Sequence, residues 1–148
     1  MILAGVTDEN VEIVKRLQPS GIDMVAAAHG GPDAEPFADI PAPAFAEDFE
    51  TVFFGAGLRG SYRGVEGLLA GWRDWLVAWE RYYLEAEEFI GAGDRVVVFV
   101  RARGRTSRDG VEMEHAPAAV WTVRDGLVRR IEFHIDRDEA LAAAGLDR

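Results

Sequence analysis

Cysteine, positive charge and long apolar runs are what this sequence lacks. Its 148 residues include no cysteine, which excludes disulfide bonds, thiolate zinc sites and a cysteine nucleophile. Lysine and arginine together number 16 against 26 aspartates and glutamates, so the formal net charge is −10, and such a chain repels nucleic-acid phosphates. The longest apolar runs, such as Val96–Val100, have five residues, whereas a membrane-spanning helix needs roughly 20. We therefore expect neither nucleic acid nor membrane as a partner.

The composition and the length indicate one globular domain. Hydrophobic residues make up 49% of the chain and charged residues 28%, which excludes global disorder and a fibrous chain. The length suits a single domain over residues 1–148. The segment Met1–Val6 lacks the basic region of a signal peptide and is followed by acidic residues, so we expect a cytoplasmic protein.

The first third of the chain predicts two helices, a loop and a strand. Apolar residues at helical spacing predict a first helix that begins with Thr7 as its N-cap and ends at Pro19. A short second helix is expected over Ile22–Ala28. The proline-rich stretch Pro32–Pro43 predicts a loop, and the β-branched and aromatic residues of Glu50–Phe54 predict a strand.

The segment Val65–Arg81 has the clearest helical pattern. At 100° per residue its apolar side chains fall within about 60° of Trp72, which predicts a long amphipathic helix. These side chains are Val65, Leu68, Leu69, Trp72, Trp75, Leu76 and Trp79. The preceding segment, Gly55–Gly64, matches G-x-G-x-x-G, but no helix is expected at its third glycine. We therefore interpret it as a flexible connector and not as a dinucleotide site.

The second half of the chain predicts an antiparallel meander. Strands are expected over Tyr82–Ile90, Arg95–Ser107, Val111–Arg124 and Leu127–Asp136, followed by a helix over Arg137–Ala144. Asp109-Gly110 and Asp125-Gly126 are typical of two-residue hairpin turns. Helices first and then a meander predict an α+β fold in which a curved sheet wraps over helices.

Two-residue turns at both Asp-Gly pairs would assign the side chains of these strands to two faces. One face would carry Val97, Phe99, Arg101, Arg103, Ala116, Ala118, Val120, Ile131, Phe133 and Ile135. The other would carry Val96, Val98, Val100, His115, Trp121, Arg130, Glu132, His134 and Asp136. The tryptophan-rich helix can cover one face, and we expect a partner subunit to cover the other. A bulge in either hairpin would exchange part of this assignment.

Several segments, in their order and spacing, resemble the SnoaL-like (polyketide-cyclase-like) branch of the nuclear transport factor 2-like superfamily. They are TDENVEIV (7–14), YRGVEG (62–67), GDRVVV (93–98), VWTVRDG (120–126), DRDEAL (136–141) and AGL (144–146). The resemblance implies a cone-shaped α+β barrel, with a curved antiparallel sheet wrapped around N-terminal helices and one long tryptophan-rich helix. It also implies a pocket between helices and concave sheet, and frequent homodimers. Members include ketosteroid isomerases, limonene-epoxide hydrolases, polyketide cyclases and non-catalytic binders.

The catalytic members of this family use pocket carboxylates as acids and bases. By resemblance, the isomerase-type base falls near Phe53, and the last-strand aspartate of the hydrolases and cyclases falls near Phe133. The arginine of the hydrolases has a match in Arg101, but the acid beside it is replaced by Arg103. The scaffold therefore matches while these carboxylates do not. A one-residue slip in the alignment would bring Glu132 or His134 into the pocket.

The first functional hypothesis is a homodimeric SnoaL-like domain that encloses a small, largely apolar ligand. Arg101 and Arg103 would clamp an anionic group of this ligand, such as a carboxylate, sulfate or enolate. The expected ligand-binding residues are Phe53, Tyr62, Trp72, Phe99, Arg101, Arg103, Ala118 and Phe133. The expected dimer interface contains Val98, Val100, His115, Trp121 and His134.

Two other functions stay open from the sequence, which does not decide whether the chain is an enzyme. As a hydrolase, isomerase or cyclase on a polyketide- or terpene-like substrate, it would use Arg101 for an oxyanion and His134 or Glu132 for proton transfer. As a structural dimer module, it would have a filled core. His115, His134, Glu132 and Asp136 offer metal-ligand chemistry, but without a motif such as H-E-x-x-H no metal site is predicted, and no cofactor is indicated.

Overall fold

The structure is a computed structural model that describes residues 2–18, 20–25, 45–55 and 58–146, with the backbone alone for 2–8, 55, 58 and 59. The predicted loop Pro32–Pro43 lies outside the described residues. The elements are α1 (Ile2–Leu17), β1 (Ile22–Asp23), β2 (Phe45–Gly55), β3 (Leu58–Arg63), α4 (Gly64–Trp75), β4 (Trp79–Ala92), β5 (Arg95–Thr106), β6 (Glu112–His115), β7 (Ala118–Arg124), β8 (Leu127–His134) and α5 (Arg137–Ala143).

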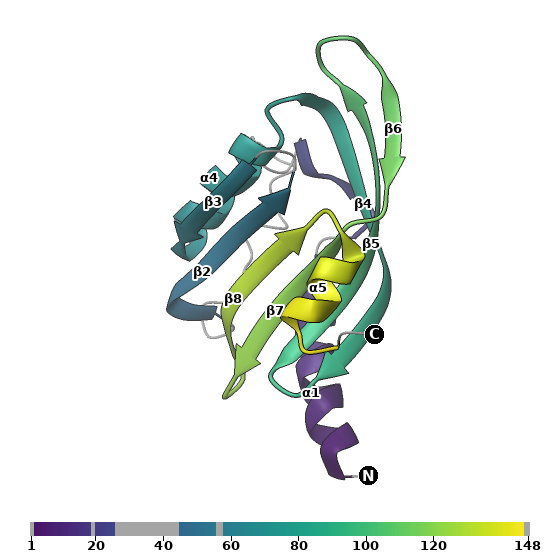
Figure 1. Ribbon diagram of the computed structural model, residues 1–148. Coiled ribbons are helices and arrows are strands. Elements are labelled where there is room, and N and C mark those ends of the chain that lie inside the picture. The colour runs from purple at the N-terminus through teal and green to yellow at the C-terminus, as the bar shows by residue number, and fades with distance from the viewer. Residues whose placement is uncertain (1, 19, 26–44, 56–57, 147–148) are drawn as a thin grey trace.

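The strands form one curled sheet (Figure 1) in the order β1-β4-β5-β7-β8-β2-β3, with β6 paired to the far end of β5. Neighbouring strands are antiparallel except β2, which runs parallel to β8. The predicted α+β fold is confirmed, with one parallel pair that the sequence did not indicate. None of the described helices is long and apolar enough to cross a membrane.

The sheet separates two apolar clusters, and we name its faces after them. The inner face carries the larger cluster, in which α4 packs on β2 and β3 while α1 packs on β4 and β5. The outer face carries a smaller cluster under α5, which lies over β7 in Figure 1. This cluster contains Val97, Ala118, Val120, Ala140, Leu141 and Ala144. On β5 and β7, a helix of the same chain therefore covers positions that the sequence grouped with the ligand pocket, whereas the positions predicted to meet a partner subunit lie in the inner core.

One hairpin forms as predicted at its turn and then departs from the prediction. Both residues of Asp125-Gly126 have positive φ angles, 56° and 77°, as a two-residue turn requires. The register then shifts, so that Arg129 is an extra residue on β8. Such a bulge moves every later side chain to the opposite face. In consequence His134, and not Phe133, lies opposite Ala118, and the predicted faces are wrong for this strand.

The other Asp-Gly hairpin is longer than predicted. The amide of Thr106 donates to the carbonyl of Val111 at 3.0 Å, so residues 107–110 form a four-residue loop. The pairing of β5 with β7 is therefore displaced by two positions. An even displacement keeps side chains on their faces, and Val97 lies opposite Val120 on the outer face as grouped from the sequence.

Helix boundaries also differ from the expected ones. The first helix begins at Ile2, so Thr7 lies within it and is not its N-cap. Residues Ile22–Asp23, expected in a second helix, form the short strand β1 beside β4. The tryptophan-rich helix ends at Trp75, because Trp79 already belongs to β4 and pairs with Thr106.

Two strand predictions need a further correction. The glycine-rich connector Gly55–Gly64 contains strand β3, which forms a hairpin with β2. The predicted strand Val111–Arg124 is divided into β6 and β7. Pro117 lies at the division, and proline cannot donate a hydrogen bond to a neighbouring strand.

Candidate functional site

Aromatic side chains from four elements meet on the inner face. The ring centroid of Phe53 on β2 lies 5.3 Å from that of Trp72 and 5.4 Å from that of Trp75, both on α4. Phe133 on β8 lies 5.1 Å from Trp72, and Tyr62 on β3 packs edge-on against Phe53 at 5.9 Å. The structure thus brings together four of the predicted ligand-binding residues, and we name these five rings the aromatic cluster.

A glycine of α4 permits this close packing. A Cβ atom at Gly71 would lie 2.6 Å from the ring of Phe53 and 2.9 Å from that of Tyr62, closer than carbon atoms approach without contact strain. The absence of a side chain there lets two rings lie against the helix backbone. The helix therefore approaches β2 and β3 more closely than any larger residue would allow.

A tyrosine–histidine pair lies on the inner face where the sheet extends towards β6. The hydroxyl oxygen of Tyr82 and Nε2 of His115 are 2.8 Å apart. Tyr82 is fully buried, whereas His115 is half-buried. The Trp79 ring flanks both, 4.9 Å from Tyr82 and parallel to the imidazole of His115 at 6.4 Å. The pair therefore has one member in the core and one near the surface.

Both members of this pair are neutral near pH 7. Burial raises the pKa of Tyr82, and the indole of Trp75 opposes only part of that rise. Burial also lowers the pKa of His115, because an imidazolium loses its hydration there. Which atom donates depends on the imidazole tautomer. Such a pair can hold a carbonyl or hydroxyl group without introducing a net charge.

Two buried polar atoms on the inner face make no hydrogen bond with the described part of the chain. They are Nε1 of Trp75 and Oγ1 of Thr51. Thr51 lies two residues before the inward-facing Phe53 on β2, so its side chain points to the same face as the aromatic cluster. Buried polar atoms without a partner are rare in folded proteins. Each of them is a potential contact for water or for a ligand.

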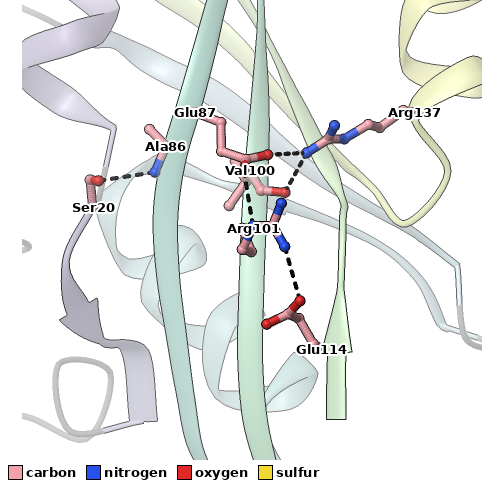
Figure 2. A network of polar contacts seen from close by, with 7 residues as sticks. All are labelled: Ser20, Ala86, Glu87, Val100, Arg101, Glu114 and Arg137. Carbon is pink, nitrogen blue, oxygen red and sulfur yellow. Dashed lines mark hydrogen bonds and ion pairs between the residues drawn. The ribbon is translucent and has the colours of Figure 1, made fainter.

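Arg101, the strongest sequence candidate, lies on the outer face with 48% of its side chain exposed. Its Nε donates to Glu87 and its Nη1 to Glu114, both at 2.9 Å. Figure 2 shows that Arg137 of α5 joins this group, donating to Glu87 at 2.7 Å and to the carbonyl of Val100 at 2.9 Å. Hydrogen bonds from Arg137 and Arg101 lower the pKa of Glu87. The network links α5 to β4, β5 and β6.

His134 and Glu132 also face outward, along β8. Nε2 of His134 lies 3.1 Å from Oε1 of Glu132, whose other oxygen accepts from Nε of Arg130 at 3.2 Å. Phe54 stacks on the imidazole at 4.6 Å. Burial raises the pKa of Glu132, but the hydrogen bond of His134 and the charge of Arg130 outweigh it, and the net pKa is lowered. These groups pair with one another on the face opposite the aromatic cluster, while Nδ1 of His134 is buried without a hydrogen-bond partner among the described residues.

The sequence profile of the SnoaL-like domain family matches residues 25–131. The chain belongs to this family. The comparison with curated proteins finds no relative of this SnoaL-like domain.

Solved structures agree with this assignment. A nuclear transport factor 2-like protein from Burkholderia xenovorans LB400 is 30% identical, with a TM-score of 0.59 over 93% of this chain and 96% of that one. TerC, co-crystallised with polyporic acid, is 26% identical, with a TM-score of 0.61 over 93% and 97% of the two chains. A protein from Jannaschia sp. CCS1, assigned as a SnoaL-like polyketide cyclase, is 20% identical with a TM-score of 0.64 over 97% and 95%, and shares the fold.

The SnoaL-like domain divides the predicted ligand-binding residues between the two faces. Phe53, Tyr62, Trp72 and Phe133 lie together on the inner face, whereas Phe99, Arg101, Arg103 and Ala118 lie on the outer face. The predicted common face is therefore wrong. The physical cause of this error is the bulge at Arg129, which places the side chain of Phe133 on the face opposite that of Ala118.

The residues predicted for the dimer interface are divided in the same way. Val98 and Val100 are fully buried in the inner core, and Trp121 is 3% exposed there, which leaves almost none of their surface for a partner. His115 lies on the inner face, separated from His134 by the sheet.

The expected histidine–carboxylate cluster therefore does not form. Asp136 instead caps α5, where its side chain accepts a hydrogen bond from the amide of Asp138 at 2.8 Å. Among the described residues no three histidine or acidic side chains gather in a way that could hold a metal ion.

Sequence reasoning missed Tyr82 as a site residue. The helical pattern of Val65–Arg81 continues through Trp79 and so conceals the start of β4. The predicted strand Tyr82–Ile90 already contained this residue, so period-two alternation with Leu84 was the signal that could have placed Tyr82 on the buried face.

Proposed function

We propose that this SnoaL-like domain binds a small, largely apolar ligand on its inner face, and that the Tyr82–His115 pair holds one polar group of that ligand. One observation carries the proposal: Nε1 of Trp75 is buried beside the Tyr82–His115 pair and lowers the pKa of Tyr82, yet it makes no hydrogen bond of full geometry with the described residues. A ligand group at this point would satisfy the indole and the pair together.

The chemistry of the inner face limits the class of ligand. Its rings are buried against one another, so a ligand that enters between them would be surrounded by apolar side chains, with the Trp75 indole as a hydrogen-bond donor. The Tyr82–His115 pair is neutral, so it favours a carbonyl or hydroxyl group over a charged one. Arg101 lies on the other face and is held by Glu87 and Glu114. The proposed ligand is therefore an apolar molecule with one neutral oxygen function.

Calorimetric titration with benzophenone, an apolar molecule with one neutral carbonyl group, tests this proposal. Tyr82→Phe removes the hydroxyl without loss of ring volume. The matched control is Tyr83→Phe, because Tyr83 is the next residue and its side chain is exposed on the other face. We expect Tyr82→Phe to raise Kd by about five- to tenfold, since one hydrogen bond contributes about 1 kcal/mol, and Tyr83→Phe to leave it unchanged.

Equal affinities for the two variants, or no binding by the natural protein, would contradict this site for a neutral aromatic ketone. Native mass spectrometry of freshly purified protein tests the wider proposal with whatever ligand the host supplies. Extra mass that is present in the native protein and lost on denaturation, and that Tyr82→Phe reduces, supports it.

The catalytic residues suggested by the sequence, Arg101 with His134 or Glu132, support a catalytic role less than the inner face supports ligand binding. Arg101 and His134 both point away from the inner face and belong to separate networks. If His134→Ala abolished turnover of any substrate that this protein converts, the assignment of its site to the inner face would fail.

We also propose a homodimer, formed through the part of the outer face that α5 leaves uncovered. The row of Arg130, Glu132 and His134 on β8 supports this location, because it brings polar side chains to the outer face two strands from the sheet edge at β3. Sedimentation equilibrium is expected to give twice the chain mass of 16.3 kDa, and a monomer would contradict the proposal. A cytoplasmic location stays a prediction.

A further inference from the structure

Strands β4, β5 and β6 run together at the extended end of the sheet (Figure 1). A hollow of about 450 Å³ lies on these strands. Its charged and aromatic lining consists of Arg81, Tyr83, Arg103, Arg105, Glu112 and Glu114. By strand alternation these side chains share the outer face, opposite Tyr82 and His115. The hollow is therefore separated by the sheet from the ligand site proposed above.

The arginines of this hollow lack strong partners. Arg81 and Arg103 make no ion pair or hydrogen bond with the described residues. Arg105 has its nearest carboxylate, Glu80, at 3.8 Å, beyond hydrogen-bond distance. Arg81 and Arg105 also lie directly opposite each other on β4 and β5, and like charges in such positions destabilise a sheet. A bound anion would remove this repulsion.

The acidic residues of the hollow form no ion pair with Arg81 or Arg103. Glu114 lies opposite Arg103 but is held by Arg101 at 2.9 Å, and Glu112 lies opposite Arg105. Because the chain as a whole carries a net charge of −10, its long-range field repels anions. Binding would therefore depend on direct contact with the guanidinium groups, which can grip a carboxylate through two hydrogen bonds.

An exposed aromatic ring adds a second kind of contact. Tyr83 is 46% exposed and lies opposite Arg103 on the neighbouring strand. A planar apolar group would bury surface against this ring, and offset stacking on a tyrosine is favourable.

From these contacts we propose that the hollow binds a small aromatic carboxylate. Arg81 and Arg103 hold the carboxylate, and the ring of the ligand lies against Tyr83. This ligand is charged and binds on the outer face, so it differs in chemistry and in place from the neutral ligand of the inner face.

The test is a titration with 4-fluorobenzoate, followed by fluorine NMR at low ionic strength. Arg81→Gln and Arg103→Gln each remove one guanidinium group. Arg129→Gln is the matched control, because Arg129 is an exposed arginine at the bulge of β8, outside the hollow. We expect each variant in the hollow to raise Kd about fivefold or more, as the loss of a charge-assisted hydrogen bond requires, while the control leaves Kd unchanged.

Two further probes identify what is recognised. The neutral analogue 4-fluorobenzamide is expected not to displace the carboxylate, and Tyr83→Ala is expected to weaken binding of 4-fluorobenzoate. The proposal is overturned if the natural protein shows no saturable binding up to about 10 mM, or if all three arginine variants bind equally. It is also overturned if Tyr82→Phe weakens binding and Arg103→Gln does not, because the probe would then occupy the inner face.

Discussion

Tyr82 and His115 illustrate how a buried neighbourhood changes the chemistry of a single residue. The hydroxyl of Tyr82 lies in the core with the imidazole of His115 as its partner. Burial makes the charged form of each group unfavourable. The pair is therefore a donor and an acceptor of hydrogen bonds over the neutral pH range, and it can recognise a neutral oxygen function.

The lowered pKa of His115 predicts a loss of stability in acid. The unfolded chain binds a proton at this histidine near the ordinary histidine pKa of 6.5, before the folded protein does. The free energy of unfolding should therefore fall as the pH decreases from about 6.5 to the lower folded pKa, and this contribution should be constant below that. We expect urea unfolding at pH 7 and pH 5 to show a smaller loss for His115→Gln than for the natural protein.

Glu132 provides a check on this prediction, because its lowered pKa acts in a different range. The stability that it contributes is complete above the ordinary glutamate pKa of 4.5 and is lost below that, as the pH falls through the folded pKa. If the natural protein and His115→Gln lose the same amount of stability between pH 7 and pH 5, His115 is not the source of that loss.

At the scale of elements, bulges decide what each strand presents. Glu87 is the extra residue where β4 shifts its register against β5, and it accepts hydrogen bonds from Arg101 and Arg137. The guanidinium of Arg137 also lies over the ring of Phe99 at 4.5 Å. These contacts hold the first turn of α5 on the outer face, above its apolar cluster.

Replacement of Arg137 should loosen α5 in particular. In Arg137→Gln the contacts to Glu87 and to the carbonyl of Val100 are lost, while the burial of Leu141 remains. We expect amide hydrogen exchange in α5 to become about three- to tenfold faster, with the core strands little affected. The control is Arg124→Gln, because Arg124 makes an exposed ion pair with Asp94 at 3.4 Å. Equal exchange in α5 for both variants would contradict the role of Arg137.

At the scale of the whole molecule, one sheet separates two sites of unlike chemistry. The inner face offers rings and a neutral polar pair, whereas the outer hollow offers arginines within a chain of net charge −10. Electrostatic contacts near the surface are screened by salt, and apolar burial is not. The two proposed ligands should therefore respond differently to ionic strength.

We expect about 0.5 M salt to raise the Kd of 4-fluorobenzoate by roughly threefold or more, because exposed guanidinium contacts are screened at that concentration. The Kd of the inner-face ligand should stay the same or fall, since salt does not weaken apolar burial. Titrations of both ligands at low and high salt test this difference. A parallel loss of affinity for both would indicate that they share one site.

The elements of this protein could be predicted from its sequence because their causes are local. Helical spacing around Trp72 and the Asp125-Gly126 turn act within a few neighbouring residues. The overall architecture was predicted from the segments that resemble the SnoaL-like family in their order and spacing. The aromatic part of the site, Phe53 with Trp72 and Phe133, followed from that resemblance and is present on the inner face.

Tertiary structure alone decided which face each strand presents. One bulge at Arg129 moved His134 away from the aromatic cluster and brought Phe133 into it, because a single inserted residue reverses the alternation of every residue after it. Whether a strand bulges depends on how well both faces pack against distant elements, here α4 on one side and α5 on the other. The same packing joined Tyr82 to His115, which are far apart in the sequence, and left Arg81 and Arg103 without acidic partners among the described residues of the outer face.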